Sequence, residues 1–308
     1  MDNQDLEKLN QVQAKDNEIE FNQLETQTND LGQKIGFNIL RIATWIILAI
    51  VAIILFHIAS RGIGVINWEF LTQPPRSGMT EGGIWPAIMG TVFVTMLTAA
   101  FAVPIGVFAA VYLNEYATQG KLTRLIRMAI RNLAGVPSVV YGLFGVAIFV
   151  QRAPFGTSIL SAGLTLGLLT LPVTITASEE ALKSVPNSYR HGALALGVSK
   201  WYTIRTIVLP NAISGILTGG ILGLSRAAGE TAPILFTGAA YSLPRLPDSL
   251  SSQFMALPYH LYILSTQHHD IRTVRPIAYG TALVLITLVL IMNLGAILIR
   301  SKVRNKNE

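Results

Sequence analysis

The segment that decides the fold runs from Glu179 to Pro233 and reads EEALKSVPNSYRHGALALGVSKWYTIRTIVLPNAISGILTGGILGLSRAAGETAP. Its first half, up to Leu209, is polar, amphipathic and rich in residues that favour helices. Its second half is a long apolar helix that carries Arg226 and Glu230, four positions apart. A charged pair within an apolar span is typical of a polar pathway through a membrane. We therefore expect a folded element that contacts a soluble partner, followed by a span beside which a small polar solute passes.

The composition places this segment in a membrane protein. The 308 residues are 51% hydrophobic and only 13% charged, with a mean hydropathy of +0.49, whereas a soluble domain is about 25% charged. The net charge of +6 is expected to reflect basic residues at cytosolic loops, so a nucleic-acid partner is not predicted. The absence of cysteine excludes disulfides, thiolate zinc sites and a cysteine nucleophile.

The order of apolar and polar segments predicts an all-α, polytopic membrane protein with about six transmembrane helices. Residues 1–36 form a polar tail that we expect to be cytosolic and either disordered or loosely helical, and residues 37–60 form the first span. The other five spans are expected at 86–112, 133–150, 158–177, from 211 onward and at 277–299. They lie within a core of residues 82–300, which a basic tail at 301–308 follows.

The distribution of Lys and Arg predicts the orientation of these spans. If the amino terminus is inside, the inner loops hold twelve of these residues and the outer connections six. One of the inner segments, residues 114–132, is interpreted as a basic loop. Both termini and the loop at 179–210 are therefore expected in the cytosol. Residues 254–265 are too short to cross and are expected at the interface or in a re-entrant segment.

The cytosolic segment contains a motif with the spacing G-x9-I-x-L-P, formed by Gly197, Ile207, Leu209 and Pro210. It resembles the EAA loop of ABC importer permeases, which forms a short coupling helix in a groove of the ATPase. A glycine at this place allows a sharp turn and close backbone approach between two short helices. The family usually has an acidic residue six positions before the glycine, where this chain has His191. An ordinary amphipathic interfacial helix is the alternative.

Three flanking stretches narrow the resemblance: NLAGVPSVVYGLFG at 132–145, TASEEALKSVP at 176–186 and RAAGETAP at 226–233. Together they are similar to the PstA-type permeases of phosphate ABC importers, over roughly residues 82–238. The resemblance implies an ABC importer type I (MetI-like) permease core. It also implies a PstC-type second permease, a PstB-type ATPase dimer and an external PstS-type phosphate-binding protein. The ATP and Mg would be used by the ATPase, and this chain would bind no cofactor. The ATPase contacts implied by the coupling loop are Arg190, His191, Ala193, Gly197, Ile207, Leu209 and Pro210.

The charged pair gives a hypothesis for the solute pathway. Residues at i and i+4 share one helix face, and Arg226 lies roughly 22 Å along the helix from Asn211, past the middle of a bilayer core of about 30 Å. A guanidinium presents a fork of donors to phosphate oxygens. We expect Arg226 to contact the anion, Glu230 to hold the arginine, and Thr231 of the same motif to line the pathway. A structural ion pair is the alternative. Arg131 could help the anion leave, or it could serve as a topology anchor.

These observations predict a permease subunit of an ATP-driven phosphate importer in the bacterial inner membrane. The chain has no Walker phosphate loop, so it is not expected to be an enzyme. His268, His269 and Asp270 are interpreted as a solvated loop and not as a metal site. Three alternatives remain: a permease for sulfate, molybdate or another oxyanion, a regulatory membrane subunit in phosphate sensing, and an ion channel. The coupling loop argues against the last.

Overall fold

The computed structural model describes residues 30–305 and divides into two units at residues 57 and 58. In the first unit, the described residues belong to a single helix, α2, which begins at Asp30 and continues to Gly62. It begins seven residues before the predicted start of the first span. Its apolar side chains are exposed, as those of a lipid-facing span are. Of the predicted tail, residues 1–29 lie outside the described part of the chain.

The second unit is built from helices and one small hairpin. A first group precedes the centre of the chain: η1 (Ile63–Val65), α3 (Trp68–Thr72), β1 (Pro75–Arg76), η2 (Ser77–Met79), β2 (Glu81–Gly82), α4 (Trp85–Val111), η3 (Tyr112–Tyr116), α5 (Lys121–Ala134), α6 (Ser138–Gly145) and η4 (Val146–Arg152). A second group follows: α7 (Ile159–Lys183), α8 (Asn187–Ala195), α9 (Lys200–Thr203), η5 (Ile204–Val208), α10 (Leu209–Gly229), α11 (Ala232–Thr237), α12 (Leu257–Thr266) and α13 (Ile271–Asn305). The prediction of an all-α, polytopic fold is confirmed.

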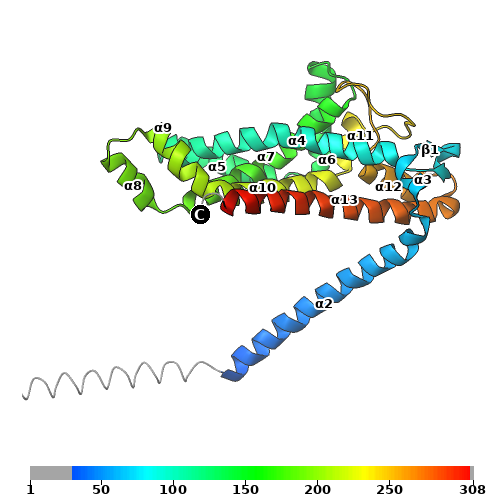
Figure 1. The fold of residues 1–308 in the computed structure, drawn as a ribbon, viewed down its shortest axis with the longest axis horizontal. Coiled ribbons are helices and arrows are strands. Elements are labelled where there is room, and N and C mark those ends of the chain that lie inside the picture. The colour runs from blue at the N-terminus through cyan, green and yellow to red at the C-terminus, as the bar shows by residue number, and fades with distance from the viewer. Residues whose placement is uncertain (1–29, 306–308) are drawn as a thin grey trace, which may run out of the picture. The chain divides into compact units, whose positions relative to one another are not determined.

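Helices α4, α7, α10 and α13 run along one another and form the bundle (Figure 1). Helix α7 lies between α4 and α10 and is the most buried of the spans. Small residues allow this close packing: a Cβ added at Gly219 of α10 would collide with the Cβ of Ala177 on α7. The same pattern at Gly215 and Ala181, one turn further along, shows that α7 and α10 are antiparallel.

The third predicted span differs from its prediction. Residues 121–134, most of which were expected in the basic loop at 114–132, form the amphipathic helix α5. It is followed after a bend of 102° by α6 and η4. The helix forms because three arginines lie on one face and apolar residues on the other. It ends at Ala134 because Pro137 disfavours helical backbone at the residue before it. Five helices are long and apolar enough to cross a membrane, and this bent pair is the sixth candidate among the described residues.

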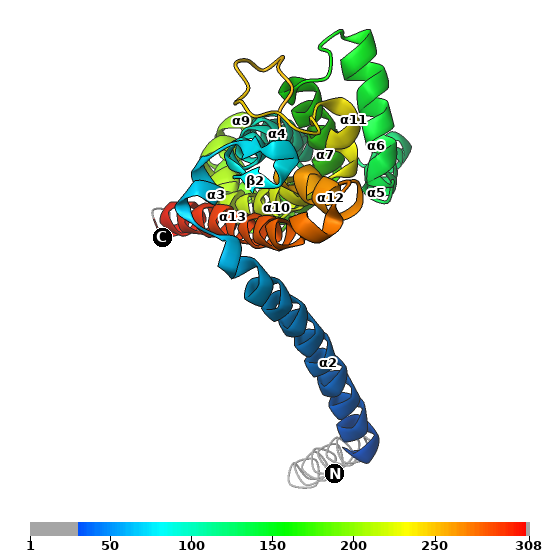
Figure 2. The same cartoon turned by 90° about the vertical axis from the view of Figure 1, so that its right-hand side faces the viewer.

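The two ends of the bundle carry different elements. Helices α8 and α9 lie at one end, and α3, the hairpin of β1 and β2, and α12 lie at the other (Figure 1). Figure 2 shows α5 and α6 at the right-hand edge of the bundle, beside α11. Helix α12 is buried and packs against α13, and with ten residues it is too short to cross.

Candidate functional site

We call residues 187–210, within the predicted coupling loop, the coupling segment. It consists of α8, a turn, and the short helices α9 and η5, which lead into α10. Helix α8 ends at Ala195, and Gly197 follows with a φ of 76°, in the left-handed region that favours glycine. A Cβ added to Gly197 would meet no atom of the described chain within 4 Å. The glycine therefore serves the sharp turn, and the expected close backbone approach is not found within this chain. The Ser199 side chain then caps α9 by accepting a hydrogen bond from the Tyr202 amide.

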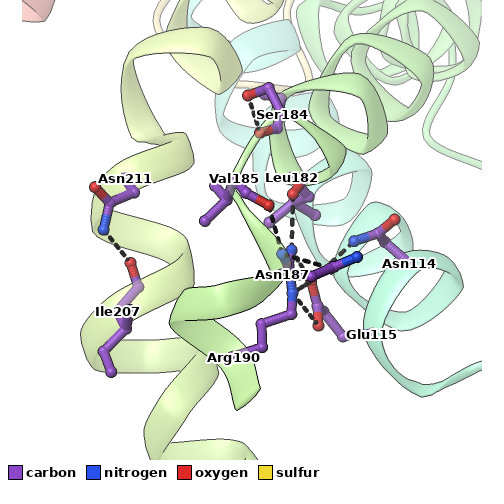
Figure 3. Close-up of polar contacts among 10 residues, drawn as sticks. Asn114, Glu115, Leu182, Ser184, Val185, Asn187, Arg190, Ile207 and Asn211 are labelled. Carbon is purple, nitrogen blue, oxygen red and sulfur yellow. Dashed lines mark hydrogen bonds and ion pairs between the residues drawn. The ribbon is translucent and has the colours of Figure 1, made fainter. Parts of the chain in front are cut away.

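Arg190 of α8 points into the protein, where all three of its guanidinium nitrogens donate hydrogen bonds (Figure 3). Nη2 donates to Glu115 Oε1 and to the Leu182 carbonyl, both at 2.8 Å, and Nη1 donates to the Val185 carbonyl at 2.7 Å. The side chains of Arg190 and Glu115 are only 14% and 6% exposed. We call this group of four residues the coupling clamp. It attaches α8 to η3, at the end of α4, and to the end of α7.

The clamp changes the expectation for Arg190, which was grouped with the residues that contact the ATPase. The guanidinium of Arg190 donates to residues of the same chain, and these hydrogen bonds hold α8 in position. Sequence reasoning missed Glu115, because its partner lies 75 residues away. The available signal was an acidic residue immediately after an apolar span, where a cationic partner is expected.

The outer side of the coupling segment is apolar. Exposed side chains are those of Tyr189, Leu194, Leu196, Trp201 and Tyr202. His191 is exposed beside them, while Ala193 is buried and Ile207, Leu209 and Pro210 are half-buried. An exposed apolar patch at a polar end of a membrane protein is typical of a surface that another protein covers. Of the predicted coupling residues, His191 is thus directed outward, and Ala193 packs inside.

A second ion pair connects α5 to α7. Arg127 Nε lies 2.8 Å from Glu179 Oε1, and Lys183 Nζ lies 2.8 Å from the same oxygen. Arg127 also donates from Nη2 to the Leu113 carbonyl at 2.8 Å. Glu179 is 9% exposed, so this carboxylate requires its cationic partners. Arg131 lies one turn further along α5, and the described residues show no contact between it and Arg226.

The predicted pathway pair lies at the end of a helix. Arg226 belongs to α10, but the helix ends at Gly229, and Glu230 has an extended backbone. The prediction that both residues belong to one helix is therefore wrong. They still pair, since Arg226 Nε donates to Glu230 Oε1 at 3.1 Å. Thr231 follows and precedes α11. The helix breaks here because the Gly229-Glu230-Thr231 stretch precedes Pro233, which has no amide hydrogen to continue it.

The break after α10 lies beside the break between α5 and α6. A Cβ added at Gly142 of α6 would lie 3.1 Å from Pro233 Cα of α11, so the two short helices touch. Tyr141 of α6 donates from its hydroxyl to the Leu133 carbonyl of α5 at 2.9 Å, so α5 and α6 are also joined across the bend. A broken helix beside the charged end of another span is typical of solute sites in transporters.

Arg226 retains donors that no described residue uses. Its side chain is 48% exposed, and within residues 30–305 only Nε donates to a protein acceptor. Nη1 and Nη2 are therefore open to a ligand. Because a guanidinium binds tetrahedral oxyanions through two parallel hydrogen bonds, the site can hold such an anion while Glu230 fixes the orientation of Nε.

One of the two histidines before α13, His268, is structural. His268 is buried, its Nε2 lies 2.8 Å from the Gly78 carbonyl, and its Nδ1 accepts from the Asp270 amide. Its ring stacks on His269 with centroids 4.3 Å apart. The interpretation of a solvated loop is therefore wrong for His268, whereas His269 and Asp270 are exposed. No cluster suited to a metal occurs among the described residues.

The comparison with known proteins agrees with this geometry. A family model described as "binding-protein-dependent transport system inner membrane component" matches residues 102–305. The chain belongs to this family of permeases, which are multi-pass membrane subunits and not enzymes.

Individual relatives define the branch of the family more closely. The chain is 34% identical over 263 residues to the probable ABC transporter permease protein YqgI of Bacillus subtilis, covering 82% of this chain and 89% of the relative. It is 39% identical over 220 residues to the phosphate transport system permease protein PstA 1 of Mycobacterium tuberculosis (strain H37Rv), covering 71% of this chain and 70% of the relative. The fold is similar to that of a chain of the inward-facing MetNI methionine ABC transporter, with a TM-score of 0.58 and 16% identity. The match covers 70% of this chain and 94% of the other. The predicted MetI-like permease core is confirmed.

Proposed function

We propose that this chain is the PstA-type permease subunit of an ATP-driven inorganic phosphate importer. The observation that carries the proposal is Arg226, which has open donors near the end of α10, where the following helix α11 packs against α6 of the bent pair. A hydrogen phosphate anion needs such a fork of donors and a nearby cation. Relatives that are 32–39% identical are named as phosphate permeases, and this supports phosphate over other oxyanions.

The coupling segment supplies the connection to ATP hydrolysis. In this proposal, a PstB-like ATPase dimer covers the apolar side of α8 and α9, and the coupling clamp transmits its movement to α4 and α7. ATP and Mg are used by that ATPase and not by this chain. A PstC-like permease completes the pathway, a PstS-like binding protein delivers phosphate from outside, and both termini lie in the cytosol.

The test is the uptake of radiolabelled phosphate at low external phosphate, in cells with and without this chain, with sulfate measured in parallel. We expect deletion to remove phosphate uptake and leave sulfate uptake unchanged, once other phosphate systems in the cell are inactivated. Loss of sulfate or molybdate uptake alone would assign a different oxyanion. Unchanged uptake of every anion, together with altered phosphate-dependent gene expression, would favour the regulatory alternative instead.

A further inference from the structure

A cationic face of α5 borders two adjoining cavities at the end of the bundle that carries the coupling segment. The larger cavity, of about 510 Å³, is lined by Arg124, Arg127 and Arg131, all from α5. The smaller, of about 330 Å³, shares Arg127 and Arg131 with it and adds residues of α7, including Lys183. The three arginines recur at intervals of three and four residues, so they lie on one helix face.

These cavities contain more positive than negative charge. Their linings hold four cations, Arg124, Arg127, Arg131 and Lys183, against the two carboxylates of Glu179 and Glu180, which leaves an excess of two positive charges. Arg127 and Lys183 are already paired with Glu179. Arg124 and Arg131 form no ion pair with any described residue, and their guanidinium groups are the free donors. An excess of two charges matches the charge of a hydrogen phosphate dianion.

The smaller cavity and the Arg226 site can be related through α7, which lines the cavity and packs against α10. A Cβ added at Gly223, one turn before Arg226, would lie 3.5 Å from Thr174 Oγ1 and 3.9 Å from Thr170 Cβ on α7. Because α7 and α10 are antiparallel, Arg226 lies level with about residue 170 of α7. Thr176, the first α7 residue of the cavity, is about six residues or roughly 9 Å further toward the coupling end.

We infer that Arg124 and Arg131 form a binding site for a phosphate group, on the inner side of the Arg226 site. Arg127, held by Glu179, keeps the helix face in place, and the two free guanidinium groups receive the ligand. The phosphate group belongs either to inorganic phosphate leaving the pathway or to the headgroup of an anionic phospholipid. The first source rests on the proposed function, whereas the site itself rests on the arginines and cavities.

The experiment uses the complete transport complex in nanodiscs of phosphatidylcholine, without binding protein or ATP. Every complex carries Arg226→Gln, so that the Arg226 site does not contribute, and bound radiolabelled phosphate is measured at equilibrium with wild-type α5 and with the Arg124→Gln/Arg131→Gln double variant. The matched control is Lys121→Gln/Lys302→Gln, which removes two exposed positive charges that do not line the cavities. A third variant, Arg124→Lys/Arg131→Lys, preserves the charge and shows whether loss of binding reflects misfolding.

We expect the double glutamine variant to bind phosphate about tenfold or more weakly, since both guanidinium groups that receive the ligand lose their charged donors. The matched control is expected to bind normally and the lysine variant to keep part of the affinity. A parallel measurement in nanodiscs containing phosphatidylglycerol determines how much of this lipid stays with each purified complex. Loss of retained lipid with unchanged phosphate binding would assign the site to the lipid headgroup.

Two results separate this inference from the proposed function. Equal binding of both phosphate and phosphatidylglycerol by the complex with wild-type α5 and by the double glutamine variant would overturn the site. If instead the complex imported sulfate and not phosphate, the proposed substrate would be wrong, and loss of bound sulfate in the same variant would still establish an anion site.

Discussion

Two of the arginine–glutamate pairs in the described part of the chain, Arg190–Glu115 and Arg226–Glu230, differ in burial and in hydrogen bonding. Arg190 and Glu115 are 14% and 6% exposed, and every nitrogen of the guanidinium donates to a protein acceptor. Arg226 and Glu230 are 48% and 16% exposed and share a single hydrogen bond. A saturated, buried guanidinium fixes structure, whereas a half-exposed one with open donors can bind a ligand. The number of donors already used therefore distinguishes the coupling clamp from the proposed solute site.

The largest effect on stability is expected at the coupling clamp. Arg190→Gln leaves the Glu115 carboxylate buried without its partner, which costs about 3–5 kcal/mol. Thermal unfolding of the purified complex would show the loss. The double variant Glu115→Leu/Arg190→Met removes both charges and is expected to lose less. A single variant as stable as the wild type would show that the clamp is not structural.

Replacement of the other arginine is expected to affect transport and not stability. Arg226→Gln removes a half-exposed pair, worth at most about 1 kcal/mol to folding, but it removes the donors for the anion. Phosphate uptake should fall tenfold or more, while Arg226→Lys keeps the charge without the fork and should be intermediate. Uptake kinetics with the amount of assembled complex as the control would test this. Uptake at the wild-type rate in both variants would instead favour the structural ion pair.

The stability of the protein is expected to fall at low pH because of His260, which is buried at the end of the bundle opposite the coupling clamp. Burial lowers the pKa of His260 on the short helix α12 to about 4, below its usual 6.5. The unfolded chain therefore takes up a proton as pH falls below 6.5, while the folded chain does so only near 4, and stability decreases in this window. At pH 5 the free energy of unfolding is expected to be lower by about 2 kcal/mol. Stability measured at pH 7 and pH 5 should differ less in His260→Leu, and an equal pH response would contradict the burial argument.

The smallest effect is expected at the turn of the coupling segment. Gly197→Ala forces a side chain into the left-handed region, which costs about 1–2 kcal/mol. Gly192→Ala is the matched control, because Gly192 lies within α8 and an added Cβ would meet no described atom within 4 Å. Alanine there should be neutral or slightly stabilising. Equal stability of the two variants in thermal unfolding would show that the turn tolerates other residues.

The features that depend on local sequence were predictable. Apolar length predicted every span except the bent third one, and the spacing from Gly197 to Pro210 predicted a turn at the glycine, which has a positive φ. Contacts between distant segments were not predictable, because no local pattern joins Glu115 to Arg190 or Arg127 to Glu179. The break at Gly229 was also missed, since an apolar run with charges four residues apart is equally compatible with a continuous helix.

The most direct test of the distinction between the two arginines is phosphate uptake measured together with ATP hydrolysis, in proteoliposomes that hold the Arg226→Gln complex and its binding protein. If Arg226 contacts the anion and the coupling clamp is a separate device, ATP hydrolysis continues while phosphate uptake falls tenfold or more. Uptake that stays in its wild-type proportion to ATP hydrolysis would contradict this account.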